Sequence, residues 1–416
     1  MSSGQLYDVI VIGGGPSGMM AAGRAAERGR KVLLLEKNKD LGKKLSITGG
    51  GRCNILNAEP DTRKLLENFG PAAKFLHSPF SQHGMQDSWD FFTERNLPIV
   101  VEARKRAFPE SQSAPDVTRV MRQYCIENNV ELKVKTRVEE FIVEDGVLKG
   151  VKTNHGSYLG TNFILATGGS SHPETGASSQ GVELLTQFGH NVHEPTPNLV
   201  PLKVEEDWVK NCSGTTLTFM KITFGTNRSK AEQFSKTGKI LFTHFGLSSP
   251  LILNASYQVK QLLQGGKVQA IIDMYPDTDT GTLRNRVLAV FEASKNKTLR
   301  NVLKEFVPAG MTDAVAAQIG PELLEEKVHS VTKDARHEIV DRIKAMPVTI
   351  NGTMGLDWAV ISDGGVDLSE VDTKTMASRL VPNLYLTGDV LHINRPSGGF
   401  GLQLAWTTGW VAGQNT

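Results

Sequence analysis

Regularly spaced glycines near the start of the chain are the first residues whose types suggest chemistry. An apolar run from Asp8 leads into a G-x-G-x-x-G turn made of Gly13, Gly14, Gly15, Pro16, Ser17 and Gly18. In such a turn the first glycine allows a tight bend, the second lets the backbone approach a pyrophosphate, and the third lets a helix pack on the strand. The helix start adds N–H groups and positive dipole. The spacing therefore predicts a dinucleotide-binding turn.

The elements around this turn occur in the required order. Residues 7–12 and 31–35 are apolar, which predicts strands, and the alanine-rich residues 16–28 predict a helix. Glu36 follows the second strand, 18 residues after Gly18, where a carboxylate can accept hydrogen bonds from a ribose. This context favours dinucleotide binding over a structural glycine turn. It does not separate FAD from NAD.

A second glycine cluster follows this carboxylate. Its residues with cofactor-binding potential are Ser46, Gly49, Gly50, Gly51, Arg52, Cys53 and Asn54. Consecutive glycines expose backbone N–H groups that form an anion nest, and Arg52 adds positive charge beside a phosphate or a flavin ring. Because no second cysteine is near in sequence, Cys53 is interpreted as a packing residue. A flexible surface loop is the alternative interpretation.

Three later loops point to a flavin. Predicted strands at 162–166 and 383–386 end in glycine-containing turns, formed by Ala166, Thr167 and Gly168 and by Thr387, Gly388 and Asp389. Glycine at a strand end lets a cofactor lie over the carboxyl edge of a sheet, and Asp389 suits the ribityl hydroxyls. The loop before a predicted final helix at 403–412 contains Gly399, Phe400, Gly401 and Leu402. That helix start suits the electron-rich carbonyl edge of a flavin.

Histidines supply the candidate acid–base groups. His244 lies in Phe-Thr-His-Phe-Gly, where it is predicted to act as a general base or substrate partner, or to lock the local fold by bonding to backbone. His190 and His193 flank a predicted helix end and suit a capping role. No carboxylate or histidine cluster predicts a metal site, so we expect no metal.

Length and texture predict several domains. A chain of 416 residues exceeds one compact core, and two prolines at 195 and 197 favour a boundary there. We predict an α/β fold with a dinucleotide-binding part at 1–194 and strand-like runs that return at 346–416; the family resemblance given below implies that these two parts form one discontinuous Rossmann-like FAD-binding domain. A β-rich inserted domain is expected at 195–279, and a helical subdomain at 280–345.

Bulk composition argues against several classes of protein. The charge of +2 and the 22% of charged residues give no basic surface by bulk charge, so a nucleic-acid partner is not expected. No apolar run approaches the roughly 20 residues of a membrane span, which predicts a cytoplasmic protein without a membrane partner. The three cysteines contain no C-x-x-C pair, so neither a disulfide framework nor a structural zinc site is expected. The oligomeric state stays open.

The order of motifs resembles one flavoprotein family. GGGPSG, GGGRCN, LFTHFGLSSP, TGD and a late GGF loop follow one another along essentially the whole chain. This order is similar to the family that contains aminoacetone oxidase and the bile-acid reductase BaiN, with GGGRCN and LFTHFGLS as its signatures. The resemblance implies FAD, a discontinuous Rossmann-like domain, and an insert with a β-barrel part and a helical part.

The resemblance also assigns site residues and marks departures. It implies that the glycine loops above line FAD together with Lys37, and that Val138 contacts the adenine through its backbone. Members of the family often have Gly-Gly-Tyr-Asn at the late loop, where this chain has Phe400 and Gly401. Many have Glu where this chain has Asp389. These changes should leave cofactor binding intact, but they weaken substrate analogy.

The predicted reaction is flavin-dependent hydride transfer with a small organic substrate. No second G-x-G-x-x-G follows a strand, so NAD(P)H, if it is the electron donor, is expected to dock transiently on the flavin. One alternative is an oxidase of a small amine or amino ketone that produces hydrogen peroxide. Another is a flavin-binding protein with a macromolecular partner such as tRNA, which the near-neutral charge disfavours.

Overall fold

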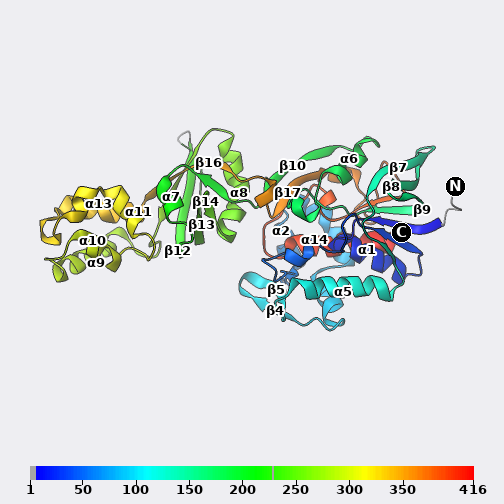
Figure 1. The fold of residues 1–416 in the computed structure, drawn as a ribbon, viewed down its shortest axis with the longest axis horizontal. Helices are drawn as coiled ribbons and strands as arrows, with labels where there is room; N and C mark the ends of the chain where they lie inside the picture. Colours follow the sequence, from blue (N-terminus) through cyan, green and yellow to red (C-terminus); the bar gives the residue numbers. More distant parts are fainter. Residues whose placement is uncertain (1–5, 227–228) are drawn as a thin grey trace. The chain divides into compact units, whose positions relative to one another are not determined.

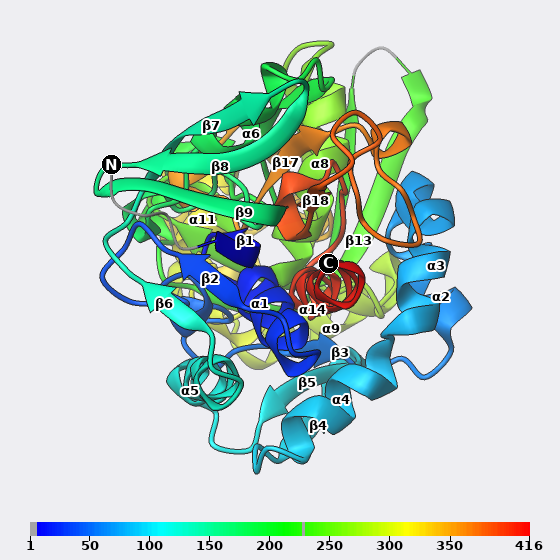
Figure 2. The same ribbon diagram turned by 90° about the vertical axis from the view of Figure 1, so that its right-hand side faces the viewer.

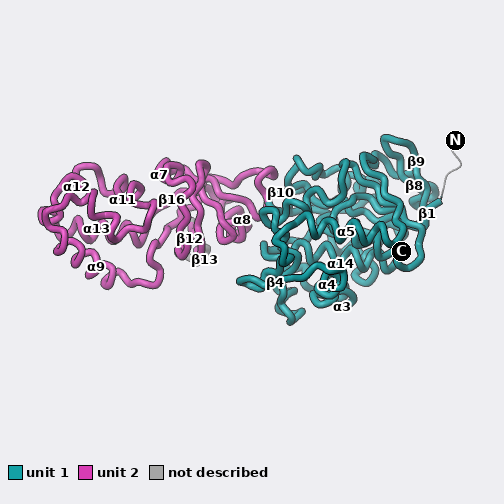
Figure 3. Tube along the Cα trace, turned by 60° about the horizontal axis from the view of Figure 1, so that its bottom comes forward, with its two compact units in different colours: residues 1–197, 360–416 teal, residues 198–359 magenta. Residues whose placement is uncertain are grey.

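A computed structural model describes residues 6–226 and 229–416 of the chain and divides them into two compact units (Figure 3). Unit 1 consists of residues 1–197 and 360–416, and unit 2 of residues 198–359. The chain therefore passes from one unit to the other twice. Each unit has its own hydrophobic core, which is what independent compact units require.

Unit 1 is built on a seven-stranded sheet (Figure 2). The parallel strands are β6 (Glu131–Lys133), β2 (Val32–Leu35), β1 (Leu6–Ile12), β9 (Gly156–Leu165) and β18 (Leu384–Leu386). The central parallel strands are apolar where they are buried on both faces, which holds for β2, most of β1 and the second half of β9. The antiparallel strands β7 (Val138–Glu144) and β8 (Val147–Thr153) continue from the first half of β9.

Two helices from opposite ends of the sequence pack tightly against each other in unit 1. α1 (Pro16–Glu27) and α14 (Phe400–Asn415) lie side by side (Figure 2). A methyl group at Gly409 would collide with the backbone of Ser17, and one at Gly413 would collide with that of Ala21. Glycines four residues apart thus let the two backbones approach, with α14 parallel to α1.

The remaining elements of unit 1 surround this arrangement. The three-stranded sheet β3 (Leu56–Asn57), β5 (Arg106–Pro109) and β4 (Ile99–Glu102) is antiparallel. The further helices are α2 (Thr62–Glu67), α3 (Ala73–Gln82), α4 (Met85–Thr93), α5 (Ala114–Glu127) and α6 (Gln180–Thr186). The strands β10 (Val192–Asn198) and β17 (Ile361–Val366) pair with each other and lead to the two passages between the units.

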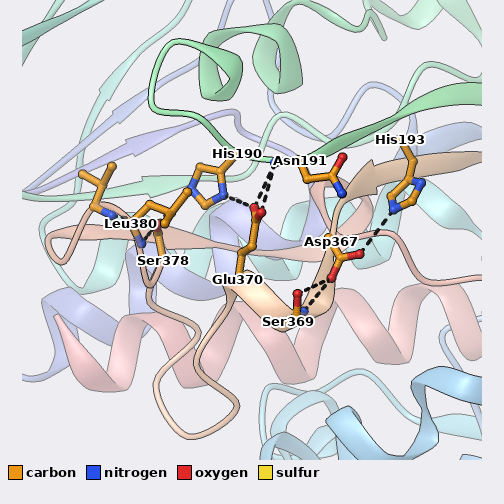
Figure 4. Close-up of polar contacts among 9 residues, drawn as sticks. His190, Asn191, His193, Asp367, Ser369, Glu370, Ser378 and Leu380 are labelled. Atoms are coloured by element: carbon orange, nitrogen blue, oxygen red, sulfur yellow. Dashed lines mark hydrogen bonds and ion pairs between the residues drawn. The ribbon is translucent and has the colours of Figure 1, made fainter.

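A polar network fastens the segment after α6 to the chain that precedes β18 (Figure 4). The buried His190 contacts Glu370 Oε2 at 2.7 Å through Nδ1 and Ser378 Oγ at 2.8 Å through Nε2. His193 contacts Asp367 at 3.5 Å. Neither histidine caps a helix as the sequence suggested, because both side chains pair with carboxylates from a distant segment.

Unit 2 contains a closed six-stranded barrel and a group of helices (Figure 1). The barrel strands are β11 (Leu202–Val204), β14 (Gly246–Ser248), β13 (Ser229–Thr243), β12 (Thr216–Thr226), β15 (Val268–Asp273) and β16 (Met346–Thr353). The helices are α7 (Asp207–Asn211), α8 (Pro250–Leu263), α9 (Thr280–Ala293), α10 (Leu299–Val302), α11 (Thr312–Ile319), α12 (Pro321–Glu325) and α13 (Lys333–Lys344). Residues on three neighbouring barrel strands, such as Ile222, Ile240 and Ile272, are fully buried.

The structure confirms the predicted fold class, with a Rossmann-type α/β part, a closed barrel and a helical part. One expected range differs from it. We expected residues 346–416 to belong to the FAD-binding domain, but β16 closes the barrel by pairing with both β15 and β11. The second passage between the units follows Ala359. Within the described part of the chain, no helix combines the length and apolarity that crossing a membrane requires.

Candidate FAD site

The first glycine turn divides its glycines between packing and open space. Gly13 has a φ of 107°, and a β-carbon there would lie 2.5 Å from the carbonyl oxygen of Ala166. A β-carbon at Gly18 would collide with the carbonyl oxygen of Gly13. No described atom lies within 4 Å of the corresponding position at Gly15, which caps α1. The turn thus leaves free the one position where a pyrophosphate should approach.

Glu36 lies at the carboxyl end of β2, next to this turn. Its Oε2 accepts from the backbone N–H of Gly14 at 2.7 Å, and its Oε1 accepts from that of Asn38 at 2.7 Å. These bonds fix the carboxylate while each oxygen keeps a further lone pair for a ribose hydroxyl. Thr136 N–H donates to the carbonyl of Glu36 at 2.9 Å, so the chain entering β7 at Val138 runs beside it. The predicted adenine and ribose contacts therefore come from neighbouring segments.

The end of β9, which lies beside this turn, also leaves space for a ligand. Gly168 has a φ of 74°, and no described atom lies within 4 Å of the place where its β-carbon would stand. The hydroxyl oxygen of Thr167 is buried and has no hydrogen-bond partner among the described residues. Ala166 itself is buried and packs on Gly13 and Gly18. A cradle with an unsatisfied hydroxyl fits a bound polar cofactor.

The second glycine cluster shows a similar division. Gly50 and Gly51 have positive φ values of 68° and 84° and border open space, which fits a backbone nest. Gly49 packs on the backbone of Cys53 and Asn54. Burial raises the pKa of the Cys53 thiol to about 12, so it stays protonated and acts as a small packing group.

Arg52 and Asn54 are both tied to neighbouring segments. The Arg52 guanidinium pairs with Glu102, donates to Gln112 Oε1 at 2.6 Å and lies 4.3 Å from the centre of the Phe108 ring. Its charge is thus compensated on β4, whereas the sequence pointed to a phosphate or the flavin. With its amide oriented so that the nitrogen faces the neighbouring carbonyls, Asn54 donates to Ala107 and Leu56 and accepts from Gly399 N–H at 2.9 Å. Asn54 therefore joins the second glycine cluster to the late loop.

The late loop is shorter than the sequence suggested. Gly399 has a φ of 96° and caps α14, so Phe400, Gly401 and Leu402 form the first helical turn. A β-carbon at Gly399 would collide with the backbone of Leu56, which accounts for the glycine. Phe400 is buried and packs edge-on against Phe69. The start of α14 is therefore held by β3 and the helices that follow it.

The strand end at Gly388 and Asp389 contacts both helices, α1 near its start and α14 in its middle. Gly388 N–H donates to Thr408 Oγ1 on α14 at 3.0 Å, and a β-carbon on Gly388 would approach Ser17 on α1. Asp389 pairs with Arg395, a residue that the sequence did not single out. Only the proximity of an arginine to the late glycine loop could have signalled it. Lys44, also missed, donates to Ser171 Oγ at 3.3 Å.

The remaining residues predicted from the sequence are Lys37, Ser46 and His244. Lys37 donates to Ser178 Oγ at 3.1 Å, and burial lowers its pKa, although Glu36 opposes the shift. Ser46 donates to the carbonyl of Lys43 at 2.9 Å. His244 lies in unit 2, exposed in the turn between β13 and β14, with its ring 4.9 Å from that of Phe245. Its action on a flavin or substrate stays a prediction.

The residues of unit 1 thus fit an FAD. Open glycine backbone at Gly15 and Gly168, a buried hydroxyl at Thr167 without a partner and a fixed carboxylate at Glu36 provide what a dinucleotide needs. No group of three or more metal-binding side chains comes together within the ranges 6–226 and 229–416.

A solved structure shares this fold. The open conformation of a flavocytochrome c3 fumarate reductase aligns with 99% of this chain and 78% of its own, with a TM-score of 0.54 and 15% identity. At that identity the likeness concerns the fold alone.

Two curated relatives match along nearly their full length. The ribosomal RNA dihydrouridine synthase of Escherichia coli (strain K12) is 28% identical over 98% of this chain and 98% of its own. The 3-dehydro-bile acid delta(4,6)-reductase of Clostridium scindens is 28% identical over 97% of both chains. The profile of the HI0933-like protein Rossmann domain matches residues 7–415. With that match over nearly every residue and the FAD cradle described above, the chain belongs to the HI0933-like family of FAD-binding Rossmann oxidoreductases.

Proposed function

We propose that this protein is an FAD-dependent reductase of a carbon–carbon double bond conjugated to a carbonyl group, with the uracil base of a uridine in RNA as its substrate. The observation that carries the proposal is the full-length similarity to the two curated relatives. A dihydrouridine synthase adds two hydrogens to the C5–C6 bond of uracil, which is conjugated to the C4 carbonyl. A delta(4,6)-reductase of a 3-oxo compound acts on the same kind of bond. The bond chemistry is thus common to both names.

The residues of unit 1 supply the binding half of this reaction. A bound flavin, once reduced, would supply a hydride to one carbon of the double bond, and a proton must reach the other carbon. We propose that the exposed imidazole of His244 gives that proton. NAD(P)H is the proposed source of the electrons, docking transiently because the chain has no second dinucleotide fingerprint.

The barrel of unit 2 offers features that favour RNA over a small molecule. Lys221, Lys236 and Lys239 are exposed on the β12–β13 hairpin. Phe219 is 48% exposed on the same hairpin, and Lys236 Nζ lies 5.9 Å from the centre of the Phe234 ring. Lysines interleaved with aromatic rings suit a single-stranded nucleic acid. This proposal departs from our expectation that nucleic acid is not a partner.

The test begins with anaerobic reduction of the yellow protein by NADH or NADPH. The reduced protein is then mixed with ribosomal RNA that was isolated from cells without the gene for this protein. We expect flavin reoxidation together with uridines that gain two hydrogens, detected by mass spectrometry of RNA digests. RNA that is unchanged while the reduced flavin persists would contradict the RNA substrate. His244→Gln should slow reoxidation by RNA and leave reduction by NAD(P)H unchanged.

A small conjugated ketone is the second candidate substrate, which the match to the bile-acid reductase favours. Reoxidation by such a ketone without any by RNA would establish it. Bleaching by aminoacetone, followed by hydrogen peroxide formation on re-aeration, would instead indicate an oxidase. Charge reversal at Lys221, Lys236 and Lys239 separates the two reductases, because it should weaken RNA binding and leave a small ketone unaffected.

A further inference from the structure

Arg395 is a buried arginine whose guanidinium is only partly satisfied. Its side chain is 3% exposed and pairs with Asp389. Nη1 donates to the carbonyl of Ile393 at 2.9 Å. Nε is buried and has no hydrogen-bond partner within the described part of the chain. Because an unpaired donor on a buried charge is costly, this nitrogen indicates a partner of the protein in its working state.

The unpartnered Nε faces the start of α14. The position of a β-carbon at Gly401, in the first helical turn, lies 3.1 Å from Arg395 Nε. The first turn of a helix carries free N–H groups and positive dipole, so a cation beside it is unfavourable unless an anion or electron-rich group is bound there. Asp389 compensates the charge of the Arg395 guanidinium. The arrangement therefore calls for a further electron-rich group at this place.

A second cation strengthens this requirement. Lys44 interacts electrostatically with both Asp389 and Arg395, and burial is the main cause of the lowering of its pKa. Asp389 opposes that shift and Arg395 adds to it. Arg395 and Lys44 are thus two cations near the carboxylate of Asp389, with Glu174 also offsetting part of the charge of Lys44.

We infer that Arg395, together with the first turn of α14, binds the N1–C2=O edge of the flavin and holds the negative charge that this edge carries in the reduced cofactor. This inference rests on the proposed role of the α14 start in lining FAD. Arg395 is then the residue through which this chain sets the electron affinity of its flavin.

Sulfite provides a direct test on the FAD-loaded protein. Its sulfur lone pair forms a bond to flavin N5, the pair passes into the ring, and the adduct carries negative charge at the N1–C2=O edge. We expect Arg395→Gln to weaken sulfite binding at least tenfold, measured by the loss of flavin absorbance, and to lower the midpoint potential. Arg395→Lys keeps the charge and should stay within about threefold of the natural protein.

The matched control is Arg95→Gln, which removes a partly buried arginine of unit 1 that stacks on Phe91 and Tyr124. It should leave sulfite binding unchanged. Sulfite binding by Arg395→Gln within twofold of the natural protein would overturn the inference. If Arg395→Gln does not retain FAD, Arg395→Lys decides, because this variant keeps the charge and a tenfold loss of sulfite binding in it would overturn the inference. No RNA or ketone enters this assay, so its failure is distinct from failure of the proposed reaction.

Discussion

The helices α1 and α14 both begin at a glycine, but their starts are built in different ways. The start of α1 is closed mainly by neighbours in sequence, since Gly13 and Gly18 pack on each other, and the distant Ala166 only adds to this contact. The start of α14 is made by distant residues, since Asn54 and Leu56 hold Gly399. The first start is a motif that can be recognised by spacing. The second exists only once the chain has folded.

This difference predicts that the first start fails as a unit when its internal packing is broken. Gly18→Val places a side chain against the Gly13 carbonyl oxygen, so the turn cannot close and the protein should purify without flavin and largely unfolded. The ratio of flavin to protein absorbance and the melting temperature measure the effect. Gly15→Ala is the contrast, because it meets no protein atom and should lower FAD affinity while the melting temperature of the apoprotein stays unchanged. Equal destabilisation by both variants would remove the distinction.

The helix α14 as a whole should also depend on buried polar groups far from it in sequence, and pH exposes this dependence. His83 contacts Ser88 Oγ at 3.2 Å and stacks on Trp410 of α14, and burial lowers its pKa to about 4. The unfolded chain has the ordinary value near 6.5 and takes up a proton first, so stability is full above that pH and is lost as the pH falls toward 4.

We expect a loss of about 2 kcal/mol in unfolding free energy between about pH 7 and about pH 5 from His83 alone. Urea unfolding at the two pH values measures it. In His83→Gln this part of the pH dependence should disappear. An identical slope in the natural protein and the variant would show that other groups control acid stability.

The contact between the two helices should be the next most sensitive. Gly409→Ala puts a methyl group against the backbone of Ser17, and we expect a loss of about 1–3 kcal/mol from overpacking. Gln414→Ala on the same helix removes only a contact with Arg24 and should cost less. Chemical denaturation of both apoproteins makes the comparison. If Gly409→Ala lowers the unfolding free energy less than Gln414→Ala does, the two helices can move apart at little energetic cost.

Sequence reasoning succeeded where contacts are local. The strand, turn and helix from Leu6 to Glu27 follow from apolar periodicity and glycine spacing, and the structure places them within a residue or two of the prediction. The strands β4 and β5 were missed, because residues 99–109 show no clear alternation and are defined by pairing with each other and with β3. Pairing partners far apart in sequence leave no local signal.

The same limit applies within the candidate site. The glycines of the FAD loops could be predicted because a positive φ or a close approach selects glycine directly. Arg395 could not, because its significance depends on Asp389, Gly401 and burial that only the folded chain provides. The pair Gly409 and Gly413 did carry a signal, since small residues four apart on a helix favour close packing. That signal was not used.

The smallest expected effect concerns Arg52, for which sequence and structure suggest different partners. The sequence placed its charge beside a phosphate or the flavin, whereas the structure pairs it with Glu102 and Gln112 at a side chain that is 41% exposed. If the structural pairing is its main role, Arg52→Met should cost less than about 1 kcal/mol, because exposed ion pairs are screened by solvent. FAD affinity, measured by titrating the apoprotein, should then change less than threefold. Glu102→Gln should reproduce the stability loss. A tenfold fall in FAD affinity in Arg52→Met, with affinity preserved in Glu102→Gln, would instead favour the role predicted from sequence. The second glycine cluster would then bind the cofactor directly, as the first is expected to do.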